Sequence, residues 1–338
     1  MRWGIIGAGD IAGRGFAPAL SRAADTKLAA VQCRTLDKAQ AFAQKHSAAK
    51  AYDSIEALLA DPAVDAVYIA TPNSLHAPHT IAAANAGKHV LCEKPMATTV
   101  RDAEAMIEAC ERNRVKLGVV FQNRYHEAHL EAKLLVEAGA LGEVELATAQ
   151  LCRGFATRNA HWSGWRRNLS MAGAGAIVGH AVHPIDLLRH LLGAEVREVQ
   201  AMTDEAPPER PIDEMCYALL KFSNGTHGVV IAGTLLPQYD NDAVLYGSKA
   251  KVACRSTMGN VRPDARTDMT IETPGAKVST HFGDNSQAAK MTRMVVHFSR
   301  SVHDGSEPTL SGANGLQMVR IALAVQQSAR ERRAIVID

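Results

Sequence analysis

A lysine and a proline follow directly on an apolar run in the stretch GKHVLCEKP, from Gly87 to Pro95. An ammonium is compact, positively charged and carries three donors, so it can stabilise an oxygen that gains negative charge during a reaction. If HVLC is a parallel strand, Lys94 stands at its carboxyl end, where α/β sheets bind ligands. On its own, the position fits a solvated lysine at a strand end equally well. Its meaning therefore depends on what else the sequence places at the same edge.

A glycine-rich turn near the N-terminus has the pattern G-x-G-x-x-A, made by Gly7, Ala8, Gly9, Asp10, Ile11 and Ala12. It follows a strand pattern and precedes a helical one, which is the context of a dinucleotide-binding loop. Gly7 permits the tight turn, Gly9 lets the backbone approach a diphosphate, and Ala12 lets helix and strand pack closely. The diphosphate would bind the unpaired N–H groups of the helix N-terminus. We therefore predict that this loop binds NAD or NADP.

The end of the second strand bears on the choice between these cofactors. An NAD site usually places an acid there for the ribose 2′-hydroxyl, but the stretch from Cys33 to Lys38 reads CRTLDK. Arg34 could bind a 2′-phosphate with two hydrogen bonds, Thr35 could donate to it, and Lys38 could add charge. Alternatively, Arg34 stacks on the adenine and Asp37 caps the next helix. We expect NADP to be preferred and NAD to be possible.

These residues can meet at one edge of a sheet only if the strands and helices follow a particular order. Up to about residue 122, helical patterns alternate with short apolar strands, which follow WGIIGAG at residues 28–33, 65–70, 89–92 and 115–121. This alternation predicts a parallel sheet covered by helices on both faces. Closely spaced strand patterns then predict an antiparallel sheet. We expect an α/β Rossmann domain at 1–122 and, at 123–338, an α+β domain with a mainly antiparallel open sheet.

Composition narrows the class of protein. The 338 residues carry 37 basic and 35 acidic side chains, a net charge of +2. This balance argues against binding nucleic acid through a basic surface. No apolar run approaches the roughly 20 residues that cross a bilayer. The six cysteines form no C-x-x-C pair, so neither a zinc site nor a redox motif is indicated, and a cytoplasmic location is expected.

Pairs of histidines with i, i+3 spacing raise the question of a metal. They are His76 and His79, His126 and His129, and His180 and His183. Two histidines on one helical face can bind a metal ion, but a site needs further ligands. No third ligand with suitable spacing accompanies any pair, so we expect no metal.

Four stretches together resemble one known family: the G-x-G-x-x-A loop, ATPNSLH ending at His76, GKHVLCEKP, and GAIVGHAVHPID ending at Asp186. They are similar to those of the glucose-fructose oxidoreductase, inositol dehydrogenase and rhizopine catabolism (Gfo/Idh/MocA) family, over nearly the whole chain. The resemblance implies an NAD(P)-dependent oxidoreductase. It would transfer hydride between the nicotinamide and a carbinol or carbonyl carbon of a sugar-, anhydro-sugar- or cyclitol-like substrate.

The resemblance also assigns roles in the first domain. Lys94 would be a catalytic residue beside the nicotinamide, and its peptide bond to Pro95 is commonly cis in the family. Glu93 would hydrogen-bond near the nicotinamide ribose. The residues lining the cofactor from the neighbouring strand end would be Thr71, Pro72, Asn73 and His76.

The second catalytic residue implied by the resemblance is His183, as acid and base. The family pattern is D-x-G-x-H, but this chain has Gly179 at the position of the aspartate. His180, next to the vacant position, could substitute for it. Asp186 could instead hold the imidazole, because i, i+3 residues share a helical face. The departure leaves open how His183 is oriented.

Further contacts to cofactor or substrate are implied for Arg124, Tyr125, Trp165 and Arg166, although each could equally be structural. The loop from Arg153 to Met171 is expected to shape the substrate pocket. Relatives pack the outer face of their antiparallel sheet against another subunit, so a dimer or tetramer is implied. The partners expected are thus a small-molecule substrate and a second copy of the chain.

Two alternative functions remain at this stage. The missing aspartate at Gly179 also fits an enzyme for an unusual carbonyl, such as an aldehyde, an aromatic semialdehyde or a keto-glycoside. Some relatives are dinucleotide-sensing regulators without catalysis, but Lys94 and His183 are both present and favour an enzyme.

Overall fold

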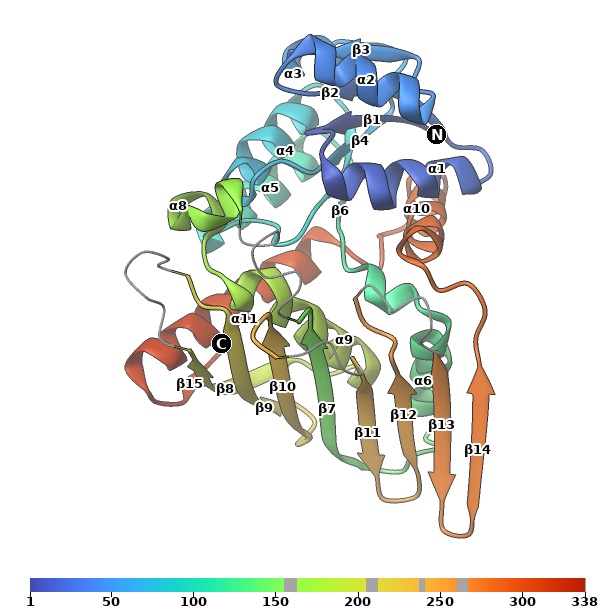
Figure 1. Ribbon diagram of the computed structural model, residues 1–338, viewed down its shortest axis with the longest axis vertical. Coiled ribbons are helices and arrows are strands. Elements are labelled where there is room, and N and C mark those ends of the chain that lie inside the picture. The colour runs from blue at the N-terminus through green and yellow to red at the C-terminus, as the bar shows by residue number, and fades with distance from the viewer. Residues whose placement is uncertain (155–162, 205–211, 237–240, 260–266, 338) are drawn as a thin grey trace. The chain divides into compact units, whose positions relative to one another are not determined.

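The computed structural model describes residues 1–154, 163–204, 212–236, 241–259 and 267–337. The chain forms two compact units (Figure 1). The first unit consists of residues 1–122 and 287–319, and the second of residues 123–286 and 320–338. Residues 287–319 belong to the first unit, although they lie within the range 123–338 expected for the second domain.

The first unit contains a six-stranded parallel sheet in the order β3-β2-β1-β4-β5-β6. The strands are β1 (Arg2–Ile6), β2 (Lys27–Gln32), β3 (Lys50–Tyr52), β4 (Ala66–Ile69), β5 (His89–Cys92) and β6 (Leu117–Val119). This order confirms the predicted Rossmann fold, and it reverses direction between β1 and β4. Ligands of such sheets bind outside the carboxyl ends of the strands at this reversal.

Helices cover both faces of this sheet, as predicted. They are η1 (Ala12–Phe16), α1 (Ala17–Arg22), α2 (Leu36–His46), α3 (Ile55–Leu59), η2 (Asn73–Leu75), α4 (His76–Asn85), α5 (Val100–Arg112), α10 (Gln287–Asp304) and the first residues of α11 (Gly312–Glu331). On one face, the Trp3 ring of β1 contacts the rings of Phe16 and Phe298, with centroids 5.2 and 5.7 Å apart. The next residue, Gly4, faces α3, because a Cβ there would lie 3.0 Å from Leu58.

The second unit contains a nine-stranded sheet in the order β14-β13-β12-β11-β7-β10-β9-β8-β15. The strands are β7 (Val144–Cys152), β8 (Val196–Thr203), β9 (Met215–Phe222), β10 (His227–Gly233), β11 (Ala243–Gly247), β12 (Lys251–Arg255), β13 (Asp268–Thr273), β14 (Ala276–His281) and β15 (Ile335–Val336). All neighbours are antiparallel except β7 and β10, which run parallel. The expected mainly antiparallel sheet is confirmed, and β14 is an additional edge strand.

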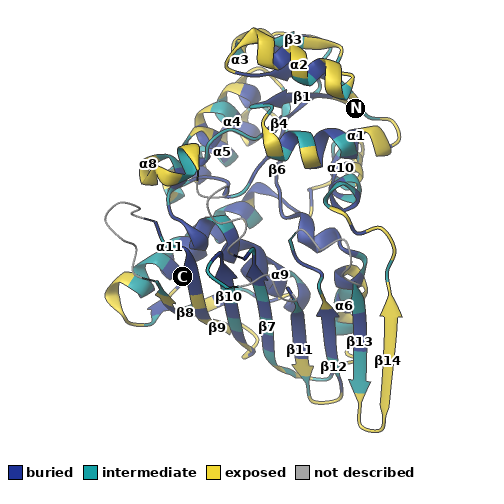
Figure 2. Cartoon of the chain, in the orientation of Figure 1, coloured by how far each residue is buried: buried dark blue, intermediate teal, exposed yellow. Residues whose placement is uncertain are grey.

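Helices cover one face of the second sheet, and among the described residues the other face carries exposed side chains on β8 and β9. The helical segments are η3 (Gln122–Tyr125), α6 (Glu127–Glu137), η4 (Gly164–Arg167), α8 (Leu169–Ala172), η5 (Ile177–Ala181) and α9 (Val182–Leu192). Helix α9 packs on β7 and β10. Strand β9 alternates buried and exposed residues along most of its length (Figure 2). Because successive side chains of a strand point to opposite faces, its exposed side chains share one face of the sheet. Within the described residues, no helix is long and apolar enough to span a bilayer.

Candidate active site

The G-x-G-x-x-A loop has the backbone that a diphosphate site requires. Gly7 has φ +81°, and a Cβ on it would lie 2.8 Å from Cγ2 of Thr71 and 3.0 Å from the Thr71 nitrogen. A Cβ on Gly9 would meet no such obstacle, since its nearest atom is the Gly7 oxygen at 3.8 Å. Ala12 is fully buried where the helix packs on the sheet. Backbone conformation and contacts within the protein thus require glycine at position 7. At position 9 the space beside the backbone is open, which fits a bound diphosphate.

The end of β2 presents exposed cations beside this loop. Cys33 is buried and its Sγ lies 3.4 Å from the Ala8 oxygen, so the two loops are adjacent. Arg34, Thr35 and Lys38 are exposed. Across the described part of the chain, neither Arg34 nor Lys38 takes part in a hydrogen bond or ion pair with protein. These side chains are therefore available to an anionic ligand at the end of β2.

In the segment after β4, the His76 side chain links the backbone at Thr71 to the backbone at Pro95, just after β5. This side chain is buried, with Nδ1 2.7 Å from the Pro95 oxygen and Nε2 2.9 Å from the Thr71 oxygen. Burial lowers the pKa of His76 to about 4, so the ring is neutral at pH 7 and donates to one of the two carbonyls at a time. The described contacts of His76 are thus with backbone, and contact with a cofactor stays a prediction. Asn73, in the same segment, is also buried.

Glu93 and Lys94 extend β5 at the carboxyl edge of the sheet. The Glu93 nitrogen donates to the Ile69 oxygen at 2.9 Å, which continues the ladder with β4. The buried Glu93 carboxylate accepts from the Tyr68 hydroxyl at 2.6 Å and from the Lys94 nitrogen at 3.2 Å. Lys94 is half-buried, and its peptide bond to Pro95 is cis, as the resemblance implies. Lys94 therefore follows a residue, Glu93, whose backbone is hydrogen-bonded to β4 and whose carboxylate is hydrogen-bonded to Tyr68 and to the Lys94 nitrogen.

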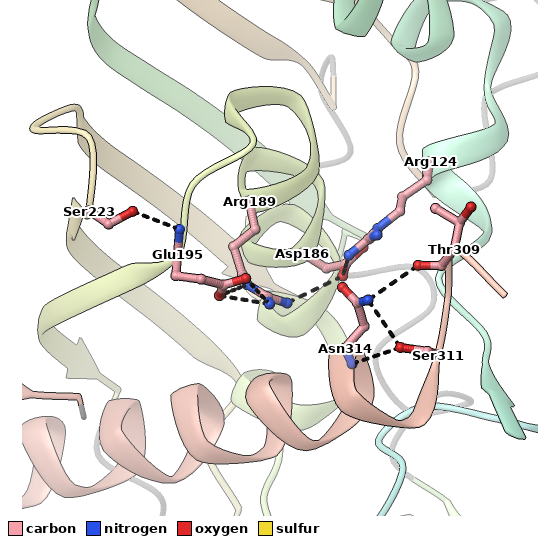
Figure 3. Close-up of polar contacts among 8 residues, drawn as sticks. All are labelled: Arg124, Asp186, Arg189, Glu195, Ser223, Thr309, Ser311 and Asn314. Atoms are coloured by element: carbon pink, nitrogen blue, oxygen red, sulfur yellow. Dashed lines mark hydrogen bonds and ion pairs between the residues drawn. The ribbon is translucent and has the colours of Figure 1, made fainter. Parts of the chain in front are cut away.

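In the second unit, Arg124 and Asp186 form a buried ion pair (Figure 3). Arg124 donates from Nε and Nη2 to the two Asp186 oxygens at 2.8 and 2.5 Å. Arg189, one turn along α9, lies 3.8 Å from Asp186 and donates twice to Glu195 at 2.8 Å. Burial acts to lower the pKa of Arg124, but the Asp186 carboxylate outweighs it and raises the pKa. Both Asp186 oxygens thus hold a guanidinium, and a role in orienting His183 stays a prediction.

The two histidines of the second unit lie at the start of the helical segment η5–α9. His180 belongs to η5 and His183 to the first turn of α9, and both are buried. Asp213 fixes the entry to this segment, because its carboxylate accepts from the nitrogens of Gly175 and Ile177, each at 2.8 Å. A Cβ on Gly175 would lie 1.8 Å from the backbone oxygen of Asp213, so only glycine fits there. Asp213 therefore holds the start of the helical segment that carries His183.

The remaining residues predicted to contact cofactor or substrate are Tyr125, Trp165 and Arg166. The Arg166 guanidinium stacks on the Trp165 ring, 4.6 Å from its centroid. Tyr125 is buried, and burial raises its pKa. The loop from Arg153 to Met171 includes residues 155–162, which lie outside the described residues. Contacts of these side chains with cofactor or substrate stay predictions.

Comparison with known proteins identifies both parts of the chain. Residues 1–121 match the model for the "Oxidoreductase family, NAD-binding Rossmann fold", and residues 129–253 match the model for the "GFO/IDH/MocA C-terminal domain". The chain belongs to the Gfo/Idh/MocA family. It is therefore an NAD(P)-dependent oxidoreductase, as the resemblance implied.

Similar members of the Gfo/Idh/MocA family match this chain over its whole length. A 1,5-anhydro-D-fructose reductase of Ensifer adhaerens is 28% identical, covering 100% of this chain and 98% of its own. A D-xylose 1-dehydrogenase (NADP(+)) of Haloferax volcanii is 29% identical, covering 100% of both. The crystal structure of an aldose-aldose oxidoreductase from Caulobacter crescentus, complexed with glycerol, has a TM-score of 0.88 at 28% identity, covering 100% of this chain and 99% of that one.

Two residues of this Gfo/Idh/MocA oxidoreductase that organise its candidate site were missed in the sequence. Tyr68 lies in the strand predicted at residues 65–70, and Asp213 was given no role. Each acts on a residue more than 20 positions away, Tyr68 on Glu93 and Asp213 on Gly175. The one available signal was a tyrosine inside an otherwise aliphatic strand, since a buried hydroxyl needs a partner.

Proposed function

We propose that this oxidoreductase transfers hydride between NADP, with NAD possible, and a carbinol or carbonyl carbon of a sugar-, anhydro-sugar- or cyclitol-like substrate. The observation that carries the proposal is the position of Lys94 at the carboxyl edge of β5, in the unit whose phosphate loop fits a dinucleotide. The names of the two full-length relatives, a reductase and a dehydrogenase of sugars, support this substrate class.

Lys94 is the residue that would act on the reacting oxygen. When bound, the nicotinamide supplies or accepts the hydride. The Lys94 ammonium donates to the substrate oxygen, and this interaction strengthens as the oxygen gains negative charge in the transition state. His183 would exchange the substrate proton as acid and base. Glu93 would hydrogen-bond near the nicotinamide ribose.

The preference for NADP is supported by the residues at the end of β2. A 2′-phosphate carries negative charge, and the fork of Arg34 can bind it with two hydrogen bonds. Thr35 and Lys38 are exposed on the same turn and can add a donor and a second charge. No acid at the tip of β2 competes for the position.

A second candidate substrate class follows from Gly179. This residue stands where the family pattern has an aspartate, four residues before the acid–base histidine. A site without that carboxylate suits a carbonyl compound that is not a polyol, such as an aldehyde, an aromatic semialdehyde or a keto-glycoside. A dinucleotide-sensing regulator is the third candidate, which the presence of both Lys94 and His183 disfavours.

The outer face of the second unit's sheet supports a dimer or tetramer. Met202 of β8 is 71% exposed, and its direct cross-strand partner Tyr217 of β9 is exposed as well. Leu219, two residues along β9, is 56% exposed and pairs with Val229 of β10. We propose that a second copy of the chain covers this apolar face. A cytoplasmic location is also proposed, which the six buried cysteines, none in a disulfide, support.

The test is a reaction of the protein with NADPH and a panel of keto-sugars, anhydro-sugars, cyclitol ketones and aldehydes, followed by nicotinamide absorbance. Turnover of sugar-like carbonyls is expected. Turnover of aldehydes alone would support the second candidate class. Tight NADPH binding without turnover of any compound, in either direction, would favour the regulator.

A further inference from the structure

Tyr68 supplies a hydroxyl to the Glu93 carboxylate inside the first unit. Tyr68 is the third residue of β4 and is fully buried. Its register partner on β5 is Leu91, so Glu93, two residues further along, projects from the same face of the sheet. The Tyr68 hydroxyl lies 2.6 Å from Oε1 of Glu93. This length is typical of a hydroxyl that donates to a charged carboxylate.

The second oxygen of the same carboxylate contacts the main chain of Lys94. The Lys94 nitrogen donates to Oε2 of Glu93 at 3.2 Å. One carboxylate thus connects the Tyr68 hydroxyl to the residue whose side chain acts in the proposed reaction. A rotation of the Glu93 side chain would release this nitrogen and with it the start of the turn that carries Lys94.

The ring that bears the hydroxyl is itself fixed. It stacks on Phe16 of η1 with centroids 3.9 Å apart and planes 3° apart. Phe16 in turn meets the edge of the Trp3 ring. Burial, together with the nearby Glu93, raises the pKa of Tyr68 well above its usual value. The hydroxyl therefore keeps its proton and remains a donor of fixed position.

We propose that Tyr68 is a positioning residue for hydride transfer: its hydroxyl holds Glu93, and through Glu93 the Lys94 segment, in the reactive arrangement. This inference rests on the proposed function. The competing role is purely structural, in which the hydroxyl only satisfies a buried carboxylate. The two roles differ in whether loss of the hydroxyl changes the rate of hydride transfer in molecules that are folded and have bound the cofactor.

The experiment compares Tyr68→Phe with Tyr52→Phe. Both variants keep the ring and remove a hydroxyl that contacts a carboxylate in the same unit, since the Tyr52 hydroxyl lies 3.1 Å from Asp61. Single-turnover hydride transfer is measured at saturating NADPH and normalised to folded protein. We expect Tyr68→Phe to lower the rate constant by about 10-fold, because small displacements of reacting groups are costly. Tyr52→Phe should change it by less than about twofold, as for sites far from the chemistry.

A double-mutant cycle with Glu93→Ala tests the route of the effect. If Tyr68 acts through Glu93, Tyr68→Phe should slow the Glu93→Ala variant by less than about twofold. Urea unfolding of the same four proteins without cofactor should show the same non-additivity in stability. A full effect of Tyr68→Phe on the rate in the Glu93→Ala background, or additive stabilities, would overturn the inference.

The outcomes separate this inference from the proposed function. An active wild type whose Tyr68→Phe variant reacts at the wild-type rate would overturn only the positioning role. A wild type inactive with every substrate of the panel would overturn the proposed function, and the positioning role with it. A loss of rate equal in Tyr68→Phe and Tyr52→Phe would assign both hydroxyls a structural role and contradict the inference.

Discussion

At the scale of the residue, the exposed cations at the end of β2 bear on the choice of cofactor. Arg34→Asp would replace a phosphate-binding fork by a like charge, so NADP affinity should fall by roughly 10- to 100-fold, the range for a lost hydrogen bond to a charged group. NAD affinity should change little. Fluorescence titration with NADPH and NADH measures both. The control is Lys45→Asp in the last turn of the same helix α2, which changes charge without touching the turn after β2.

Titration of the wild-type protein can contradict this prediction. If it binds NADH as tightly as NADPH or more tightly, the preference for NADP predicted from Arg34, Thr35 and Lys38 is wrong. Equal losses of NADPH affinity in Arg34→Asp and Lys45→Asp would show that the effect comes from net charge alone.

The buried ion pair between Asp186 and Arg124 predicts that a substitution of Asp186 has a large effect on stability. Asp186→Asn leaves a buried guanidinium without its counter-charge, which typically costs about 3–5 kcal/mol. The measurement is urea unfolding. The matched control is Glu108→Gln, which removes an exposed ion pair with Arg112 and should cost less than about 1 kcal/mol. Similar small losses in both variants would show that the Arg124–Asp186 pair does not stabilise the second unit.

At the scale of the element, the phosphate loop separates a glycine that the fold needs from one that the ligand needs. Gly7→Ala forces a side chain into a left-handed backbone and against Thr71, so stability should fall by about 1–2 kcal/mol or more. Gly9→Ala has room, so stability should stay close to that of the wild type while NADPH affinity falls. Urea unfolding without cofactor and fluorescence titration give the two quantities. A Gly9→Ala variant that binds NADPH as the wild type does would contradict the assignment of this space to the diphosphate.

Five of the six strands of the first sheet were predicted from the sequence, because their patterns are local, whereas β3, which is three residues long, was not predicted. Continuous apolar strands, the glycine loop and the helix between them each carry their own signal, and the motif from Glu93 to Pro95 carried the family's cis bond. Strand β14 was missed because all its residues are exposed, which leaves no apolar alternation to detect. It forms only because β13 offers it a partner along its whole length.

Contacts between distant segments could not be predicted in the same way. Arg124 and Asp186 were both named as candidates for the site, but their pairing depends on how η3 and α9 pack. The bond between Tyr68 and Glu93 depends on the register of β4 and β5, which no periodicity reveals. Residues 287–319 were placed in the second domain because they follow it in sequence, whereas their apolar helix faces pack with the first unit.

At the scale of the whole molecule, the open face of the second sheet predicts an oligomer. Leu219→Lys would place a charge in the middle of the apolar face, so the particle should become smaller, which sedimentation velocity measures. The control is Leu134→Lys, which introduces the same charge at an exposed leucine of α6. A monomeric wild type, or a Leu219→Lys variant of unchanged size, would contradict assembly through this face.

The proposed mechanism requires that Lys94 acts in hydride transfer, and one measurement tests this role most directly. Single-turnover hydride transfer is followed at saturating NADPH for the wild type, Lys94→Ala, Lys94→Arg and the control Lys88→Ala. Lys88 is a second half-buried lysine, immediately before β5, and its ammonium donates to the backbone oxygens of Asp61 and Val64 at 3.0 and 2.7 Å.

Lys94→Ala is expected to stay folded, to bind NADPH, and to react about 10²-fold more slowly or worse, a loss of ~3 kcal/mol in transition-state stabilisation. Lys94→Arg should be nearly as slow, because the bulkier guanidinium cannot occupy the same point. Lys88→Ala should react within about twofold of the wild type, as expected for a change away from the site. If Lys94→Ala instead transfers hydride at close to the wild-type rate, Lys94 is only a lysine at the end of a strand and the proposed mechanism is wrong.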